Sequence, residues 1–151
     1  MKTFITLLSA TAFLFAACNQ NQPKQTTEET TTENTKVATQ CYLGLSGKDS
    51  VTMSINNIDG NVTGTLVFNF LEKDDSNGDI KGSFSGDTLF VNYVFNAEGT
   101  VSKSPLVFLK KGDDLQQGYG DIVTYLGKTY FKDHSAIKFD QGFLLKPVDC
   151  K

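Results

Sequence analysis

Apolar and polar side chains alternate with a period of two through most of the chain, and short breakers separate the alternating runs. In one such run, Val51, Met53 and Ile55 alternate with polar neighbours. A period of two places every second side chain on one face of a β-strand, whereas an amphipathic helix needs a period near 3.6. The Asn77-Gly78 pair between two runs strongly favours a β-hairpin turn. The pattern therefore predicts an all-β fold.

Eight sequential strands are expected, together with a further hairpin within residues 121–132 around Gly127. Antiparallel strands in this number predict a small closed barrel, an up-and-down meander, with a β-sandwich as the alternative. Closure is favoured because it removes the edges that an apolar strand would otherwise expose. The expected strands cover residues 38–45, 50–57, 61–71, 78–85, 87–95, 105–110, 114–119 and 142–149.

The first 17 residues have the composition of a signal peptide. Lys2 supplies a positive start, a mostly apolar stretch follows, and Ala16 and Ala17 stand immediately before Cys18. The apolar stretch is too short to span a hydrocarbon layer of about 30 Å, but it suits a signal-peptide core. The Ala-Ala-Cys boundary resembles the lipobox of bacterial lipoproteins, whose Cys is acylated and becomes the mature N-terminus.

That resemblance implies that Cys18 carries palmitate-type acyl chains and anchors the mature protein to the lipid bilayer. Two or three chains on one Cys hold a protein firmly, whereas a single chain gives only marginal binding. Asn19 stands where Asp commonly marks retention in the inner membrane, so the resemblance implies transport to the outer membrane of the cell envelope. The alternative is an ordinary secretory signal that is cut after Ala17, with Cys18 as a structural residue.

Residues 19–36 contain polar side chains and a single Pro, with no large apolar side chain. Such a segment cannot bury enough apolar surface to offset its ordering entropy, so a disordered tether is expected. Fully extended, it would reach about 60 Å. The chain therefore divides into a signal peptide (1–17), a lipidated Cys with its tether (18–36) and a β-barrel domain (37–151).

A closed barrel of eight strands is either filled by side chains or holds one small ligand. In architecture, the expected domain resembles a lipocalin or fatty-acid-binding barrel. The Trp of the lipocalin Gly-x-Trp signature is absent, because the sequence contains no Trp. The domain is also similar to small uncharacterised Bacteroidota-type lipoproteins that have a Cys near each end.

With Cys18 assigned to the lipid, Cys41 and Cys150 remain, one near each end of the domain. In an exported protein, an even pair of Cys residues implies a disulfide. The first and last strands of a closed barrel are neighbours, so this pair can meet. Two free buried thiols are the alternative. A metal site is not expected, because the chain has no C-x-x-C motif and only one His.

Charge and motif spacing exclude several classes of function. The net charge is -3 and every cation is a Lys, so nucleic-acid binding is not expected. Asp133, His134 and Ser135 are the residue types of a hydrolase triad, but adjacent side chains on an extended chain cannot form the relay. The acidic run 72–79 lacks the Gly and Glu positions of an EF-hand loop. The sequence therefore predicts neither an enzyme nor a cofactor.

Two classes of function remain. The first is a membrane-anchored, non-enzymatic binding module for a small apolar or amphipathic ligand, held in the barrel or at its mouth. The second is an envelope protein-interaction or inhibitor lipoprotein. An empty central cavity would favour the first class, and a filled core with an apolar surface patch would favour the second.

Counting chain reversals predicts which connections share a rim of the barrel. Residues 46–49, 72–77, 96–104 and 120–141 are expected at one rim, and residues 58–60, 86 and 111–113 at the other. Both Cys41 and Cys150 belong to the second end, which is expected to be sealed and to face the membrane. Binding residues are often found on long loops, so the first rim is the candidate ligand site. Its candidate residues are Glu72, Asp74, Asp75, Glu98, Lys103, Asp121 and His134. The alternative is that these are solvated loop charges.

Overall fold

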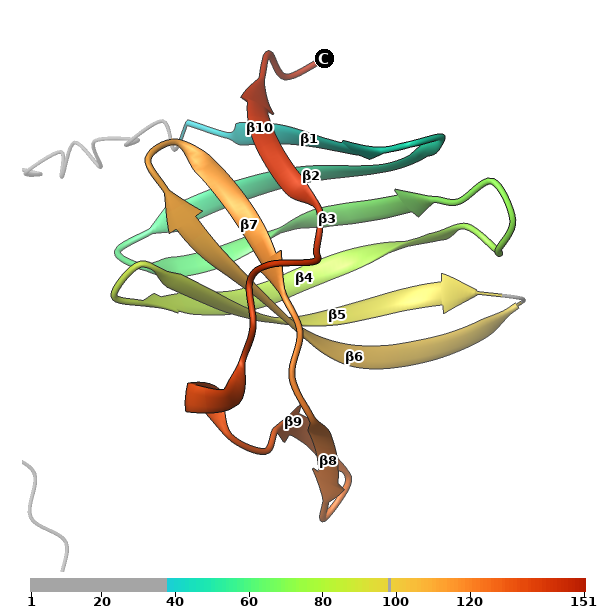
Figure 1. The fold of residues 1–151 in the computed structure, drawn as a ribbon, viewed down its shortest axis with the longest axis vertical. Helices are drawn as coiled ribbons and strands as arrows, with labels where there is room; N and C mark the ends of the chain where they lie inside the picture. The colour runs from blue at the N-terminus through green and yellow to red at the C-terminus, as the bar shows by residue number, and fades with distance from the viewer. Residues whose placement is uncertain (1–37, 98) are drawn as a thin grey trace, which may run out of the picture. The chain divides into compact units, whose positions relative to one another are not determined.

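The fold of the domain is seen in a computed structural model, which describes residues 38–97 and 99–151. The predictions for the signal peptide, Cys18 and the tether lie outside the described residues, and so does Glu98. The described chain forms a closed antiparallel barrel of eight strands (Figure 1). The predicted all-β barrel is thereby confirmed over the β-sandwich alternative. Within the described residues, no helix has the length and apolar character needed to cross a membrane.

Each barrel strand pairs with the next one along the chain, and β10 closes the ring between β7 and β1. A separate hairpin, formed by β8 (Ile122–Tyr125) and β9 (Lys128–Phe131), is inserted between β7 and β10. It confirms the hairpin predicted around Gly127, and the single-turn 3-10 helix η1 (His134–Ala136) follows it. The barrel strands are β1 (Gln40–Ser46), β2 (Asp49–Ile58), β3 (Asn61–Asn69), β4 (Ser76–Ser85), β5 (Thr88–Ala97), β6 (Thr100–Lys111), β7 (Asp114–Gly118) and β10 (Leu144–Val148).

Period-two alternation fills the inside of the barrel with apolar side chains. On β2, Val51, Met53 and Ile55 are buried, while Thr52 between them is exposed. Phe108 is the largest of the fully buried side chains, and it belongs to one continuous core cluster with the β2 residues. The barrel interior is therefore occupied by side chains along most of its length.

The seam of the barrel, where β10 pairs with β1 and β7, is its least paired region. β10 and β7 share only two residue pairs in register, Leu144↔Gln116 and Leu145↔Leu115. A disulfide joins Cys41 on β1 to Cys150 just after β10, with Cα atoms 5.3 Å apart and 109 residues apart in sequence. The predicted disulfide is confirmed, and it holds the closing strand against the first strand.

The ends of the barrel follow the predicted count of chain reversals. The β1–β2, β3–β4 and β5–β6 connections lie at one end, which we call the loop rim (Figure 1). The β2–β3, β4–β5 and β6–β7 connections lie at the other end, which we call the stapled end because the disulfide is located there. Which end faces a membrane stays a prediction.

The prediction of a long loop at residues 96–104 is wrong. β5 continues to Ala97 and β6 begins at Thr100, and these two residues pair directly. The connection is a tight turn in which Gly99 has a φ of 73°. Polar residues in this stretch, such as Lys103, suggested a loop, but continuous cross-strand pairing keeps them in the sheet because strand formation depends strongly on context. Lys103 therefore lies within a strand.

Residues 120–141 also depart from the predicted position at the loop rim. The chain leaves the barrel wall after Gly118, which pairs with Val107 partway along β6, and it then covers the outer face of β5 and β6. The Phe90 ring on that face contacts the Phe131 ring of β9 with centroids 6.5 Å apart. Outward-facing Val107 is consequently fully buried. Covering these apolar residues explains why the segment lies on the wall.

The turn of the β8–β9 hairpin holds a strained residue. Leu126 and Gly127 both have positive φ, 49° and 73°, as in a type I′ turn, whose first position favours Asn. The Leu126 side chain is 83% exposed, so burial does not compensate the left-handed backbone. We expect Leu126→Asn to raise the free energy of unfolding by about 1 kcal/mol, which corresponds to a melting midpoint about 4 °C higher.

Thermal denaturation followed by circular dichroism measures this difference. Asp59→Asn is the matched control, because Asp59 occupies a turn with a φ of 52° and already tolerates that conformation. Its melting midpoint should stay close to that of the wild type. A lower midpoint for Leu126→Asn would show that the Leu side chain makes stabilising contacts in the folded protein.

Candidate functional site

Five aromatic rings gather at the loop rim, and we call this cluster the aromatic mouth. The Phe68 ring stacks on Phe70 with centroids 5.7 Å apart, and Tyr93 stacks on Phe95 at 4.6 Å. The Phe68 ring links the two stacks, because its centroid lies 6.0 Å from the centroid of the Tyr93 ring. Its centroid also lies 6.2 Å from that of the Phe143 ring. Phe68 and Tyr93 are buried, whereas Phe70, Phe95 and Phe143 are only partly buried and pack against the core. The core therefore ends at this rim in aromatic surface that reaches solvent.

The inner layer of the aromatic mouth is fixed by hydrogen bonds. The Tyr93 hydroxyl lies 3.2 Å from the Leu66 carbonyl oxygen and 3.1 Å from Ser76 Oγ. Burial raises the pKa of Tyr93, and the hydrogen bond with Ser76 acts in the opposite direction. Gly44 leaves room for Val51 and for the outer layer, because a Cβ there would stand 2.7 Å from Val51 Cγ1 and 3.3 Å from the Cβ of Phe143.

Two carboxylates hold the chain at the aromatic mouth. Asp75 Oδ1 accepts a hydrogen bond from the Phe70 backbone N–H, and Asp49 Oδ1 accepts one from Leu71, both at 2.9 Å. The Lys73 ammonium lies 5.9 Å from the centroid of the Phe70 ring, within cation–π range. A depression of about 340 Å³ beside this loop is lined by residues 46–49 and 70–73. The mouth therefore combines apolar rings with charged groups of both signs.

Three of the seven predicted rim residues lie together. Glu72, Asp74 and Asp75 share the exposed β3–β4 connection next to the aromatic mouth. Asp75 has a structural role there, since it supports the backbone of Phe70. Glu72 and Asp74 stay available as solvated charges at the edge of the mouth.

The other predicted rim residues lie elsewhere. Lys103 is on the outer wall of the barrel within β6. Asp121 is at the base of the β8–β9 hairpin, where its backbone carbonyl accepts a hydrogen bond from the Lys132 N–H at 2.8 Å. His134 stacks on Phe90 with ring centroids 4.5 Å apart, so it also lies against the outer wall. The structure does not describe Glu98.

The Asp133-His134-Ser135 sequence forms a helix cap in the structure. Asp133 Oδ1 accepts hydrogen bonds from the backbone N–H of Ser135 at 2.8 Å and from its hydroxyl at 2.7 Å. These two bonds, the side-chain one first, hold the pKa of Asp133 below its usual value. His134 stacks on an aromatic ring, and Ser135 bonds to Asp133, so the three side chains do not form the Ser-to-His-to-Asp relay of a hydrolase.

Carboxylates of the described residues do not converge with His or Cys. No group of three or more His, Cys, Asp or Glu side chains among residues 38–97 and 99–151 is placed to hold a metal ion. The acidic β3–β4 connection instead uses Asp75 to bond its own backbone. Asp75 therefore supports the backbone of the loop, whereas Glu72 and Asp74 are exposed.

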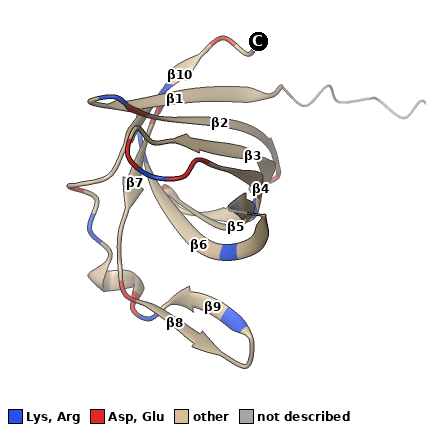
Figure 2. Cartoon of the chain, turned by 90° about the vertical axis from the view of Figure 1, so that its right-hand side faces the viewer, with Lys and Arg blue, Asp and Glu red and all other residues tan. Residues whose placement is uncertain are grey.

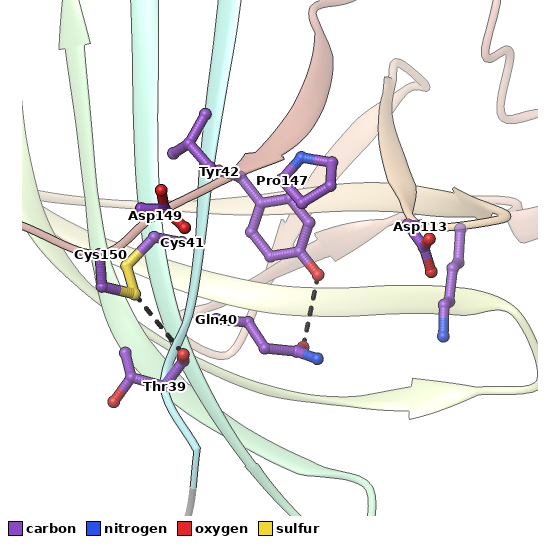
Figure 3. Close-up of a pocket in the computed structure, with 10 residues that line it drawn as sticks. Thr39, Gln40, Cys41, Tyr42, Asp113, Pro147, Asp149 and Cys150 are labelled. Carbon is purple, nitrogen blue, oxygen red and sulfur yellow. Dashed lines mark hydrogen bonds between the residues drawn. A yellow bond between two sulfur atoms is a disulfide. The ribbon is translucent and has the colours of Figure 1, made fainter.

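A second depression lies at the stapled end, where a sealed surface was predicted (Figure 3). It has a volume of about 460 Å³, and the disulfide forms part of its wall. The Tyr42 hydroxyl points at the Gln40 side chain, with an oxygen–oxygen distance of 3.3 Å. Burial raises the pKa of Tyr42, and the Asp113 carboxylate adds to the rise. The stapled end therefore carries both the disulfide and a surface depression.

A third depression lies on the outer wall, and we call it the lysine groove. It has a volume of about 820 Å³ and runs between the outer faces of β4, β5 and β6 and the β8–β9 hairpin. Lys81, Lys103 and Lys128 all line it. Sequence reasoning missed this groove, because alternation predicts the hairpin but does not say which barrel face the hairpin covers.

The aromatic mouth was also not predicted, although a signal for it exists in the sequence. Phe68 and Phe70 end one alternating run, and Tyr93 and Phe95 end another. In an up-and-down barrel, both run ends meet at the same rim, so their inward-facing rings can be expected to contact each other.

No protein-family model, curated protein or solved structure matches this chain.

Proposed function

We propose that this chain is a membrane-anchored bacterial lipoprotein whose lipocalin-like barrel is a non-enzymatic binding module. It takes a small apolar or amphipathic ligand at the aromatic mouth. The observation that carries the proposal is the set of three partly buried rings, Phe70, Phe95 and Phe143, around the core at the loop rim. Aromatic rings that remain partly exposed beside polar groups are typical of small-molecule sites.

The mouth is favoured over the barrel interior because side chains occupy the interior. Phe108, Met53 and Leu66 are among the fully buried residues that fill it. A ligand would therefore cover the rings at the rim instead of entering the barrel. Its apolar part would lie on Phe70 and Phe95, and a polar head would meet the charges of the β3–β4 connection, including Lys73 and Glu72.

Binding of the amphipathic probe 1-anilinonaphthalene-8-sulfonate to the folded protein tests this site. Its naphthalene ring suits the aromatic mouth, and its sulfonate suits a Lys side chain. Phe95→Ser should weaken probe binding by about tenfold, which corresponds to the loss of roughly 1.4 kcal/mol of apolar contact.

Val101→Ser is the matched control for this experiment. Val101 lies near the same rim on β6, pairs with Asn96 and is 64% exposed, so it is outside the mouth. The control should bind the probe as the wild type does. Equal binding by Phe95→Ser and the wild type would exclude the aromatic mouth as the site.

The lipid anchor is tested separately by the Cys18→Ala variant. Without the thiol, the protein cannot be acylated, and the whole population should move from the membrane fraction to the soluble fraction. Fractionation of cells followed by immunoblotting measures the distribution. A variant that stays as firmly bound to membranes as the wild type would rule out lipid anchoring through this residue.

An envelope protein-interaction or inhibitor lipoprotein is the second candidate function. The filled interior and the β8–β9 hairpin both support it, because a filled core with an apolar surface patch is the combination expected of this class, and Ile122, Tyr125 and Leu126 are large apolar residues that remain exposed on the hairpin. The binding module is placed first because the filled core ends at the loop rim in partly exposed rings. Exposed apolar side chains on a rigid arm are a common feature of protein interfaces. Substitution of Tyr125 and Leu126 would reduce partner binding in this case and leave probe binding at the mouth unchanged.

A further inference from the structure

The lysine groove carries an excess of positive charge in an otherwise acidic protein. Lys81 on β4, Lys103 on β6 and Lys128 on β9 line it, and Asp79 is the one acidic residue among the lining residues. The whole chain has a net charge of -3, so this concentration of Lys is local. Figure 2 shows Lys positions on both β6 and β9, the strands that flank the groove.

The spacing of the Lys residues indicates the size of the ligand. Lys81 pairs with Asn92 on β5, and Lys103 pairs with Val94 on the other side of β5. The two Lys residues are therefore two strands and two residues apart, which places their Cα atoms about 12 Å from each other. Lys128 approaches from the hairpin on the other wall. This arrangement fits an extended chain with several anionic groups better than a single phosphate.

The walls of the groove favour a sugar chain over a peptide. β5 pairs with β4 and β6 along its length, so the floor of the groove has no free strand edge, and the unpaired edge of β9 on the other wall offers a peptide only the four residues Lys128–Phe131. A strand edge this short gives few backbone hydrogen bonds, so most of the recognition must come from side chains. Besides the Lys residues, six lining residues carry hydroxyl or amide groups, which suit the hydroxyls of a sugar, and Val94 and Pro105 add apolar surface. The six are Asn61, Ser83, Asn92, Ser104, Thr129 and Tyr130.

The hairpin wall of the groove is held against the barrel by an aromatic contact. Phe131 at the end of β9 is 6% exposed and contacts Phe90 on the outer face of β5. A backbone hydrogen bond of 2.8 Å from Lys132 to Asp121 closes the base of the hairpin. A preformed groove binds without the entropic cost of ordering a loop.

We infer that the lysine groove binds an extended acidic polysaccharide, with its Lys side chains pairing with carboxylate groups along the chain. The hydroxyl and amide side chains bond the sugar hydroxyls, and the Tyr130 ring supplies a flat surface for a sugar face. This site is separate from the aromatic mouth, and it does not depend on the proposed function.

Isothermal titration calorimetry of the full chain in detergent, with oligogalacturonate as the probe, tests the inference. The triple variant Lys81→Gln, Lys103→Gln, Lys128→Gln should bind the probe at least about tenfold more weakly than the wild type. Neutral dextran of similar length should bind much more weakly than oligogalacturonate. Higher ionic strength should weaken the binding of oligogalacturonate, because the Lys residues are close to solvent.

The matched control is the triple variant Lys111→Gln, Lys138→Gln, Lys146→Gln, which removes the same charge from exposed positions outside the groove. It should bind within about twofold of the wild type. Equal losses in the two triple variants would mean unspecific charge attraction and would overturn the inference. Tighter binding of polyglutamate than of oligogalacturonate would overturn it in favour of an acidic peptide. The inference would also be overturned if the wild-type protein bound neither oligogalacturonate nor polyglutamate.

Discussion

Replacing Cys41 and Cys150 together by Ala should lower the free energy of unfolding by about 4–5 kcal/mol. The disulfide closes a loop of 109 residues, and cross-linking a loop of that length removes much conformational entropy from the unfolded chain. The bond also lies at the seam, where β10 shares only two residue pairs with β7. Urea denaturation followed by circular dichroism or fluorescence gives the difference between variant and wild type.

Reduction of the wild-type protein is the control for this prediction. Treatment with dithiothreitol should produce a similar loss of stability, because it breaks the same bond without changing the side-chain volume. A loss below about 1 kcal/mol in both cases would mean that strand pairing alone closes the barrel.

Phe108→Ala should lower the free energy of unfolding by about 3–5 kcal/mol. Phe108 is fully buried on β6, and its truncation would leave a cavity in the packed interior of the barrel. Val101→Ala on the same strand is the control, and it should change the stability by no more than about 0.5 kcal/mol, because exposed positions contribute little. The two variants can be compared in the same urea titration.

A small effect of Phe108→Ala would have a consequence for the proposed function. It would mean that the interior is loosely packed around Phe108 already in the wild type, so that a ligand could be accommodated there. A large effect supports a filled interior and a ligand at the rim. The stability measurement therefore also bears on the choice between the barrel interior and the aromatic mouth.

The strands could be predicted because their signals are local. Val51, Met53 and Ile55 alternate with polar residues, and this pattern gives both the strand and its buried face. Asn77-Gly78 was expected to be a turn, but both residues lie inside β4, where they pair with Asn96 and Phe95. The turn signal failed there because the cross-strand ladder of β4 and β5 continues through it.

The arrangement of the outer wall could not be predicted from local signals. Phe90 and Val107 pair with each other across β5 and β6 on the outer face of the barrel, and alternation alone does not indicate what covers that face. The partly buried Phe90 ring contacts Phe131 and His134, which come from a segment far along the chain. Only the folded protein shows that this segment covers the wall and forms the lysine groove.

The candidate rim residues show the same difference between features set by neighbours in sequence and features set by residues far apart in the chain. Glu72, Asp74 and Asp75 are neighbours in sequence and stay together in the structure. Lys103 was assigned to the rim because the length of β6 was underestimated. The candidate site was predicted from charged residues. The aromatic mouth was not, because its rings come from the ends of separate runs and contact each other only when the barrel is closed.

The most direct test of the account is native mass spectrometry of the protein purified from its own host. A binding module with a ligand at the aromatic mouth predicts a small molecule retained by the wild type, seen as a mass above that of the protein alone. The same species should be absent from the Phe95→Ser variant and present in the Val101→Ser control. A wild-type protein that carries no small molecule, or a variant that retains it in full, would contradict binding at the aromatic mouth.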